Sequence, residues 1–384
     1  MGAFGALGAL ACATNEPGDA SSSPPSKTIP PADAAPNEAS SDAGDDGGCS
    51  ADAGCVTTTD CTLVDFCSTE LPVTRSITLN AVWGSGANDV WIVGTRGTVL
   101  HGDGTTLTPL PSGTSDVFFA VWGTGPDDVW LMSGTSPLRS HGFVDGSASF
   151  EPVLGSTWNP YQAATGRLWT GTSLAPDQVW IGGEPTGRFD PFGGSGSLFR
   201  LGIDESSSAI WRPESACSFE QTCTPQIRAL WGTSASSLWA VGLRGQTFLL
   251  DDPDAGHWAY RNSNTSWDLE AIWGSSASDV WAVGANGTIL HSSGTASEWT
   301  ATQSPTTNTL HSVWGSGPND VWTVGDGGTV LHYDGRAWTL ATIGVPPGDV
   351  PRRLFGVWGS GPDDVWIVGE GLILHRTATN RSQP

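Results

Sequence analysis

Histidine and aspartate each recur at a fixed position of an internal repeat, and both residue types can bind a metal ion. The histidines close the third strand of their repeats, and each belongs to a different copy, so they cannot readily converge on one metal ion. We expect structural hydrogen bonds from the histidines and turn capping by the aspartates, which precede the second Trp, with weak calcium binding left open. No metal site and no cofactor is predicted. The residues are His101, His141, His291, His332 and His375, with Asp89, Asp128, Asp279, Asp320 and Asp364.

Tryptophan is the second candidate for chemistry, because an indole ring can stack on a sugar. The chain has 20 Trp against 12 Phe and 3 Tyr. Most of the tryptophans occur at fixed positions of the repeat, which favours packing between repeats over ligand binding. Trp158 lies outside the repeat register and is the better functional candidate. The repeated pairs are Trp83/Trp91, Trp122/Trp130, Trp231/Trp239, Trp273/Trp281, Trp314/Trp322 and Trp358/Trp366.

Insertions interrupt the repeats at residues 155–167, 184–196, 214–226 and 343–353, and these should share one face. Loops on one rim of a rigid scaffold are where binding sites usually lie. The alternative, of equal weight, is that the insertions arose by drift and have no function. Their side chains combine stacking and charged groups, as a glycan or peptide site would. The predicted ligand-binding residues are Trp158, Tyr161, Arg167, Arg188, Asp190, Phe192, Arg352 and Arg353.

A hydrolytic site is not evident in the sequence. A sialidase-like enzyme needs an arginine cluster, a tyrosine nucleophile and acidic partners, and the chain has only three tyrosines. A glycosidase of the usual kind needs a pair of carboxylates, and glutamate is scarce in the repeats. No Gly-x-Ser-x-Gly, P-loop or His-Glu-x-x-His motif is present. We therefore expect binding without catalysis.

The charge of the chain excludes two classes of partner. It carries 39 acidic and 16 basic residues, a net charge of −23, and Lys27 is its single lysine. Nucleic-acid binding requires a basic stripe to neutralise phosphates, so nucleic acid is not an expected partner. Adhesion to an anionic membrane surface is disfavoured for the same reason.

Short β-strands must position these residues. Residues 79–101 (LNAVWGSGANDVWIVGTRGTVLH) predict an alternating strand, a turn, a second strand, a second turn and a third strand. A weaker fourth strand follows, as at residues 336–340. Copies start near residues 78, 118, 168, 227, 268, 309 and 353, with Thr172 replacing the first Trp in the third copy. Four strands per unit predict an all-β fold, a seven-bladed β-propeller over residues 71–384, with an open β-solenoid as the alternative.

The ring of blades also needs a closing strand. The last copy has only three good strands, because residues 376–384 are too polar for a fourth. Leu71, Val73 and Ile77 alternate ahead of the first repeat. We expect residues 71–77 to supply the outer strand of blade seven and so remove an open sheet edge.

The repeats resemble the tryptophan-rich propeller units of bacterial secreted proteins, including sialidase-type Asp-box repeats and photosystem II assembly factor-like propellers. The resemblance rests on the units VWGSGxxDVWxVGxxGTxLH and on the HYDGRAW turn at residues 332–338. In that turn His332 replaces the serine of an Asp-box, and one residue is missing. The resemblance covers residues 78–384 and implies the fold, but little about function, because propellers host many chemistries.

The N-terminal residues 1–12 end in Ala9-Leu10-Ala11-Cys12, which resembles a bacterial lipobox. No basic region precedes the apolar run, so Met1 need not be the true start. We expect residues 1–12 to act as a signal peptide and Cys12 to be lipidated. The protein would then be exported and anchored in the cell envelope, at the outer membrane or cell surface, with the leaflet left open.

Two further segments precede the repeats. Residues 13–48 are rich in Pro, Ala, Ser, Gly and Asp and predict a disordered tether, because they cannot bury enough apolar surface to order. Residues 49–70 form a small cysteine-rich segment, whose even spacing and lack of histidine favour disulfides over zinc. The pairing within it stays open. The disulfide candidates are Cys49, Cys55, Cys61 and Cys67, with Cys217 and Cys223 expected to close one loop.

The sequence thus predicts a monomeric cell-envelope lipoprotein whose propeller binds a glycan or a cell-surface protein on its loop-rich face. Contact with the membrane is expected only through the lipid anchor. A sialidase-like glycoside hydrolase and an assembly or scaffold factor in an envelope complex are the alternatives. The identity of the ligand stays open.

Overall fold

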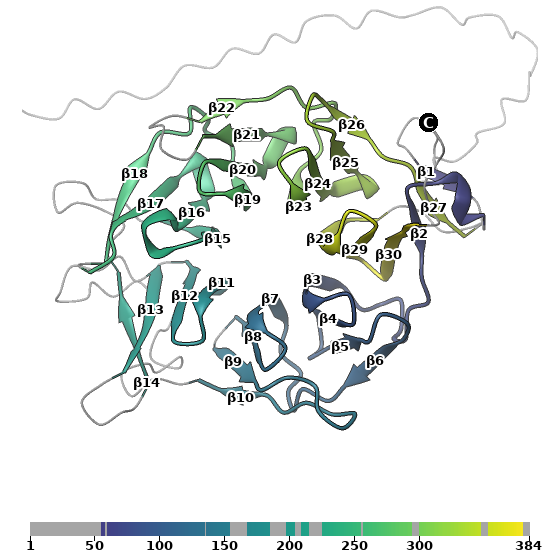
Figure 1. Ribbon diagram of the computed structural model, residues 1–384, viewed down its shortest axis with the longest axis horizontal. Helices are drawn as coiled ribbons and strands as arrows, with labels where there is room; N and C mark the ends of the chain where they lie inside the picture. Colours follow the sequence, from purple (N-terminus) through teal and green to yellow (C-terminus); the bar gives the residue numbers. More distant parts are fainter. Residues whose placement is uncertain are drawn as a thin grey trace, which may run out of the picture. The chain divides into compact units, whose positions relative to one another are not determined.

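Seven β-sheets surround a central axis as the blades of a β-propeller (Figure 1), which confirms the predicted fold. Six of them are antiparallel, and that of blade seven is mixed, since β27 pairs in parallel with its two neighbours. Within the described residues the helices are single 3₁₀ turns, and none is long and apolar enough to cross a membrane. The computed structural model describes residues 55–57, 60–134, 136–153, 167–184, 197–203, 209–214, 225–254, 256–293, 299–346 and 352–378.

Each blade begins with the strand nearest the axis. We expected Leu79, Ala81 and Trp83 to alternate without a break. Instead, the pairing register shifts between Leu79 and Ala81, and a shift occurs at the same place in all seven blades. This β-bulge separates Asn80 from the regular pairing. The inner strands are β3 (Leu79–Gly86), β7 (Phe118–Gly125), β11 (Leu168–Ala175), β15 (Ile227–Trp231), β19 (Leu269–Ser276), β23 (Leu310–Gly317) and β28 (Leu354–Gly361).

The second strand of each blade is buried on both faces, since it lies between two strands of its own sheet and between two neighbouring blades. Because both faces are buried, the strand has a continuous apolar sequence, Val-Trp-x-Val in most blades, instead of alternating apolar and polar residues. These strands are β4 (Asp89–Gly94), β8 (Asp128–Ser133), β12 (Gln178–Gly183), β16 (Trp239–Gly242), β20 (Asp279–Gly284), β24 (Asp320–Gly325) and β29 (Asp364–Gly369).

A tight turn leads to the third strand, and one of its residues adopts a left-handed conformation, as Asn286 does with φ 55° in η5 (Ala285–Gly287). Turns η4 (Leu243–Gly245) and η6 (Asp326–Gly328) are equivalent. The third strands are β5 (Val99–Gly102), β9 (Pro137–Ser140), β13 (Leu198–Ile203), β17 (Thr247–Asp252), β21 (Ile289–Ser292), β25 (Val330–Tyr333) and β30 (Leu372–Thr377).

The outer strands are shorter and more exposed, in keeping with their weak sequence signal. Six of them are the next strand in the chain after the third strand of the same blade. They are β6 (Leu107–Leu110), β10 (Glu151–Pro152), β14 (Ala209–Pro213), β18 (His257–Arg261), β22 (Thr300–Ala301) and β26 (Trp338–Leu340).

Blade seven takes its outer strands from elsewhere in the chain. The strand paired with β30 is β2 (Phe66–Ser68), followed outward by β27 (Ile343–Val345) and β1 (Cys55–Thr57). The prediction that residues 71–77 form this strand is wrong. Leu71, Val73 and Ile77 instead pack against the apolar cluster of blade one, which accounts for their alternation.

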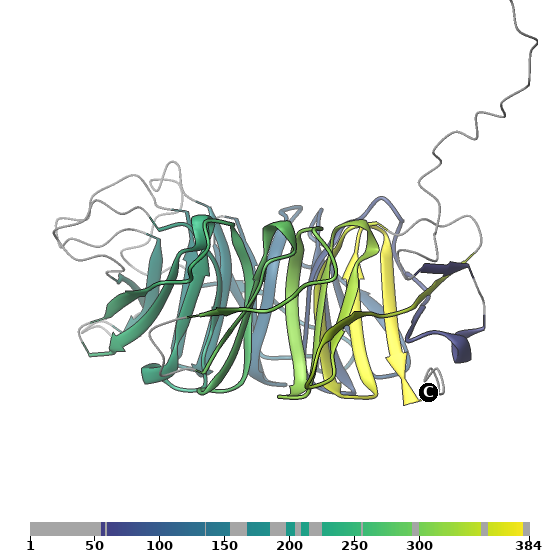
Figure 2. The same ribbon diagram turned by 90° about the horizontal axis from the view of Figure 1, so that it is seen from above.

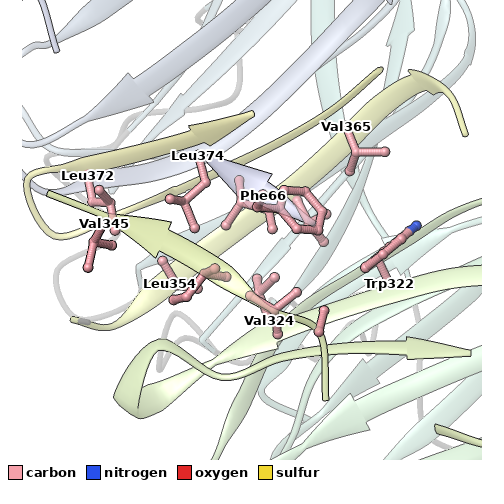
Figure 3. Packing of buried hydrophobic residues seen from close by; sticks show 13 residues of the cluster. Phe66, Trp322, Val324, Val345, Leu354, Val365, Leu372 and Leu374 are labelled. Carbon is pink, nitrogen blue, oxygen red and sulfur yellow. The ribbon is translucent and has the colours of Figure 1, made fainter. Parts of the chain in front are cut away.

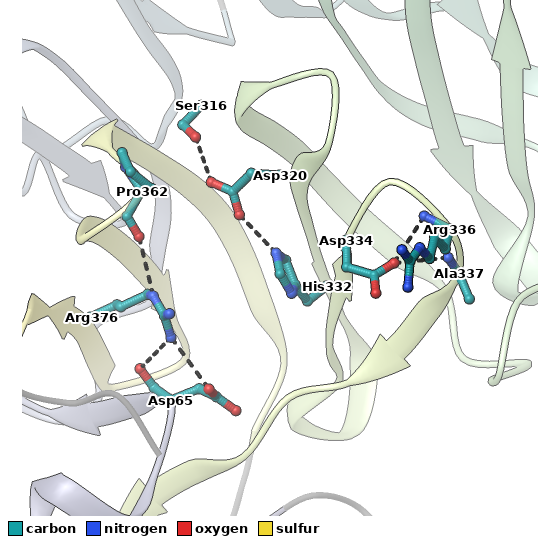
Figure 4. Close-up of polar contacts among 9 residues, drawn as sticks. All are labelled: Asp65, Ser316, Asp320, His332, Asp334, Arg336, Ala337, Pro362 and Arg376. Atoms are coloured by element: carbon teal, nitrogen blue, oxygen red, sulfur yellow. Dashed lines mark hydrogen bonds and ion pairs between the residues drawn. The ribbon is translucent and has the colours of Figure 1, made fainter. Parts of the chain in front are cut away.

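The closing strand is fixed by packing and by polar contacts. Phe66 is fully buried and meets the Trp322 ring edge-on at 5.0 Å (Figure 3). The carboxylate of Asp65 accepts hydrogen bonds of 2.8 Å from the backbone and hydroxyl of Thr342. It also lies 3.3 Å from Nη1 of Arg376 on β30 (Figure 4). Asp65 thus connects the segment that leads into β27, through Thr342, with the third strand β30, through Arg376.

One of the predicted disulfides is present, between Cys61 in η2 (Cys61–Leu63) and Cys67 in β2. Cys55 contributes only its backbone in β1 to the described residues. The predicted lipidation site Cys12, the predicted tether 13–48 and three cysteine candidates lie outside the described residues. Those three are Cys49, Cys217 and Cys223.

Paired tryptophans join the blades, as the sequence predicted. The first Trp of one blade lies against an inner-strand glycine of the next, as Trp83 does at Gly123. The second Trp is buried and in three blades meets a Trp from the outer part of the next blade, as Trp281 meets Trp338 with ring centroids 5.4 Å apart. The Trp–Gly pairs are Trp358–Gly84, Trp83–Gly123, Trp122–Gly171, Trp231–Gly274, Trp273–Gly315 and Trp314–Gly359.

A single added methyl group should disrupt one of these junctions. A β-carbon at Gly123 would lie 2.2 Å from the backbone oxygen of Asp128 and 2.6 Å from Cη2 of Trp83. We expect Gly123→Ala to lower the free energy of unfolding by about 1–3 kcal/mol, the usual cost of overpacking. Gly125→Ala, where no atom lies within 4 Å, is the matched control. Equal urea midpoints for the two variants would contradict this packing role.

Candidate functional site

The two faces of the propeller differ in the connections they carry (Figure 2). The turn between the second and third strands lies beside the connection between blades. In blade one, for example, Thr95 N donates to Thr78 O at 2.9 Å and Gly97 N to Asp116 O at 2.6 Å. We call this the loop-rich face, because the insertions 155–167, 184–196 and 214–226 connect strand ends that lie on it. The predicted insertion at residues 343–353 is wrong in its first part, since Ile343–Val345 form β27 of blade seven.

A ring of seven side chains, the bulge ring, lies on the inner strands at their loop-rich ends. Its members occupy the bulge position, the second residue of each inner strand. All seven are partly buried. Most inner-strand positions repeat from blade to blade, whereas this one carries six different residue types. The members are Asn80, Phe119, Trp169, Arg228, Glu270, His311 and Phe355.

Neighbouring members of the bulge ring contact one another across the blade junctions. Phe119 meets Trp169 edge-on, with ring centroids 4.8 Å apart. The guanidinium of Arg228 lies 5.1 Å from the centre of the Trp169 ring, within the range of a cation–π interaction. At Asn80 the amide Nδ2 donates a 2.8 Å hydrogen bond to the backbone oxygen of Phe118 in the next blade.

The charged half of the bulge ring continues the chain of contacts. Nε of Arg228 lies 3.7 Å from Oε2 of Glu270, and the His311 ring lies 5.1 Å from Phe355. Nε2 of His311 bonds to Oδ1 of Asp326 at 2.8 Å. Burial raises the pKa of Glu270, and the nearby charges of Arg228 and His311 oppose that rise.

Two ring members carry polar atoms without a hydrogen-bond partner among the described residues. These atoms are the indole Nε1 of Trp169 and Nε of Arg228, both shielded from solvent. Each is a donor only, so a ligand carbonyl or carboxylate would satisfy it. The bulge ring therefore offers an aromatic pair, a charged pair and unsatisfied donors within one contiguous set.

Three of the eight ligand-binding residues predicted from the sequence lie in the described part of the chain. Arg167 lies 5.9 Å from the Trp169 ring, and Arg353 lies 3.5 Å from Asp326, the partner of His311. Both therefore flank the bulge ring. Arg352 is exposed, with no contact to the ring among the described residues. The other five, Trp158, Tyr161, Arg188, Asp190 and Phe192, lie outside the described residues.

The sequence analysis missed the bulge ring, although its signal was present. The residue after the first apolar position differs between almost all copies, in LNAVW, LEAIW and LHSVW for example. Read as plain alternation, this residue would be an ordinary surface position. Only the β-bulge shows that it leaves the regular pairing of the inner strand.

The repeated His–Asp pairs lie on the opposite face and form closed networks. In blade six, the Asp320 carboxylate accepts a 2.5 Å hydrogen bond from Ser316 and lies 2.7 Å from Nε2 of His332 (Figure 4). The His332 ring in turn stacks on Trp322. The carboxylate lies between serine and histidine, so the histidine does not contact the hydroxyl as a nucleophilic triad requires. The structural hydrogen bonds predicted for His101, His291, His332 and His375 are thus confirmed.

Blade two departs from the expected pattern. His141 is exposed beyond the end of β9, so its predicted place in the third strand is wrong. Arg139 is the residue paired with Trp130, and its Nε bonds to Oδ1 of Asp128 at 2.8 Å. The described residues contain no group of three or more His, Cys, Asp or Glu that could hold a metal ion.

Comparison with known proteins adds information on the fold. No protein-family model and no curated protein sequence matches the chain. A structure described as YCF48 bound to D1 peptide has a TM-score of 0.59 at 20% identity, covering 82% of this chain and 97% of that one. A streptogramin B lyase has 0.61 at 10%, covering 80% and 95%. Sqt1 of Chaetomium thermophilum, bound to the N-terminus of ribosomal protein L10, has 0.56 at 14%, covering 82% and 100%.

The closed Asp–His networks should make stability sensitive to acid. Burial alone would raise the pKa of Asp320, but hydrogen bonds from His332 and Ser316 outweigh it and hold that pKa below 3.8. The stabilisation is therefore complete above pH 3.8 and is lost as the pH falls through the lower folded value.

We expect Asp320→Asn to lower the free energy of unfolding at pH 7 by about 1.5–3 kcal/mol, as for a bond to a charged group. Its stability should then fall less than that of the unaltered protein on acidification, measured by urea titration. Asp127→Asn, an exposed position in the equivalent turn of blade two, is the control. A parallel loss of stability in all three proteins would refute the assignment.

Proposed function

We propose that the chain binds a segment of another protein, without catalysis, across the bulge ring on the loop-rich face. The observation that carries this proposal is the diversity of the bulge position within an otherwise repeated strand. Packing demands a similar residue in every blade, and the neighbouring positions meet that demand with Leu, Ile or Phe before the bulge and Ala, Ser, Thr or Gly after it. The bulge position is not constrained in this way and carries aromatic, cationic, acidic and amide side chains in different blades.

A peptide suits this set of groups better than a small molecule does. Stacking surfaces at Phe119 and Trp169 accept apolar side chains, while the Arg228–Glu270 pair and the unsatisfied donors match backbone and charged groups. Loops on a rigid scaffold commonly serve such binding. Two propellers of similar fold have been seen with protein segments, YCF48 with D1 peptide and Sqt1 with an L10 terminus. This support is analogy at the level of the fold.

The test uses a displayed peptide library selected against the purified protein. We expect Trp169→Ala and Arg228→Ala each to weaken the selected peptides at least about tenfold, or about 1.4 kcal/mol. Trp267→Ala, which removes a half-exposed tryptophan from the loop-rich face outside the ring, is the matched control. Circular dichroism checks that the variants fold.

Different outcomes separate the alternatives. Peptides that bind the two ring variants as tightly as the unaltered protein would place the site elsewhere. Retention on a glycan array that depends on Trp267 would favour a glycan ligand. Sugar release from a chromogenic panel, abolished by one acidic substitution, would instead show a hydrolase. One stoichiometric partner crosslinked in cells would favour an assembly role.

Export and lipid anchoring at Cys12 form a separate part of the proposal. The Cys61–Cys67 disulfide supports it, because such bonds persist in oxidising compartments. We expect Cys12→Ser to move the protein from the membrane fraction to the soluble fraction of expressing cells. Cys61→Ser removes a cysteine without touching the anchor and should leave the fractionation unchanged. Membrane association that survives Cys12→Ser would rule out the anchor.

A further inference from the structure

A tight turn of the same form joins the second and third strands in blades one, four, five and six. In blade five, Thr288 N donates to Ala285 O at 3.1 Å, and both residues between them have positive φ. This is a type I′ turn, which strongly prefers Asn-Gly, Asp-Gly or Gly-Gly at its centre. The central pairs are Arg96-Gly97, Arg244-Gly245, Asn286-Gly287 and Gly327-Gly328.

Two of these turns carry an arginine at a position whose conformation does not favour one. Blades five and six have Asn286 and Gly327 there, the residue types that adopt positive φ at low cost. Arg96 has φ 58° and Arg244 has φ 56°, where a residue with a β-carbon and a long side chain is strained. Turn geometry alone therefore favours Asn or Gly at both positions.

Contacts within the fold do not offset this strain. Both arginines are exposed, and neither guanidinium has a hydrogen bond, ion pair or cation–π contact among the described residues. Arg244 N donates a 2.8 Å bond to Oδ1 of Asp268, but any residue except proline could donate it from its backbone. Residues held in a strained conformation without benefit to the fold occur mainly at functional sites.

The exposed charges of the two faces are opposite in sign. The exposed acidic residues on the described strand connections of the loop-rich face are Glu70 and Asp116. The exposed arginines there are Arg75, Arg96, Arg167, Arg244, Arg352 and Arg353. The turns of the other face carry exposed Arg336 and the exposed aspartates Asp103, Asp127, Asp145, Asp177, Asp252, Asp254 and Asp334. The loop-rich face therefore attracts an acidic partner, although the whole chain has a net charge of −23.

We propose that the protein segment bound across the bulge ring is acidic, and that Arg96 and Arg244 contact it on the two sides of the ring. This inference rests on the proposed function and names the charge of the partner. Blades one and four lie on opposite sides of the propeller (Figure 1), so a segment that crosses the ring between them meets one arginine at each end. Exposed charges at the rim of an interface steer association and fix the orientation of the partner.

The test compares two displayed peptide libraries, one with Asp and Glu but no Lys or Arg, and one of the reverse composition. We expect the purified protein to enrich peptides from the acidic library. Arg96→Asn combined with Arg244→Asn should weaken these peptides at least about tenfold at low ionic strength, or about 1.4 kcal/mol. The difference should shrink as salt screens the exposed charges. Arg336→Asn removes the same charge from the other face and should leave binding unchanged.

Stability gives a second readout, which arginines with a structural role would move in the opposite direction. The double variant should unfold at a higher urea concentration than the unaltered protein, because asparagine adopts the left-handed conformation more readily. Asn286→Arg makes the reverse exchange at the same turn position of blade five and should lower the urea midpoint. A lower midpoint for the double variant, or an unchanged one for Asn286→Arg, would overturn the argument from strain.

The outcomes also separate this inference from the proposed function. If Trp169→Ala weakens the peptides but the double variant does not, or if basic peptides are enriched instead, the bulge ring stands and the acidic partner is refuted. If only the double variant weakens them, an acidic segment binds away from the bulge ring, and its placement across the ring is refuted. Phosphatidylglycerol vesicles that bind as tightly as the peptides, through the same two arginines, would make the partner an anionic membrane and overturn the proposal.

Discussion

The contact between a tryptophan of one blade and a glycine of the next is the constraint on which the propeller depends. A sheet this narrow cannot bury both faces alone, so each blade is stable only against its neighbours. At Trp83 and Gly123 the indole occupies the volume that a β-carbon would need. The ring closes only because the N-terminal segment brings Phe66 into blade seven, against Trp322. Every other feature is built on positions that this packing either fixes or leaves unconstrained.

The bulge position is the clearest example of an unconstrained one. Leu79 and Ala81 are constrained by packing. The register shift between them takes Asn80 out of the regular pairing, so packing does not constrain Asn80 in the same way. The same release occurs in every blade, so seven side chains are free to differ. The repeat thereby separates a variable position from the positions that join the blades, since the bulge residue differs from blade to blade while the Trp–Gly contacts recur. A ligand site assembled this way receives one side chain from each blade, and its precision comes from the rigidity of the ring.

The structure could be predicted from the sequence where a residue has the same single structural role in every repeat. The Trp pairs, the Gly-Asn-Asp turns and the number of blades follow from a pattern repeated often enough to exceed local variation. It failed where contacts are long-range or weakly encoded. Residues 71–77 alternate like a strand, yet Phe66–Ser68 occupies the place beside β30, because Asp65 anchors it to Thr342, far away in the sequence. His141 was misplaced because Arg139, of a different type, fills the position that histidine holds elsewhere.

Departures from a repeat carry more information than the repeat itself, provided that packing does not explain them. The change at blade two, Arg139 for histidine, is explained, because Asp128 still receives its partner and the network stays closed. At blade three the aspartate is replaced by Gln178, and Glu214 supplies the counter-charge to Arg200, with Oε1 3.2 Å from the same Nε atom through which Arg139 contacts Asp128. Arg200 is retained there because its loss would leave the buried carboxylate of Glu214 unpaired. In blade four the aspartate and the cation are both absent, so neither charge lacks a partner.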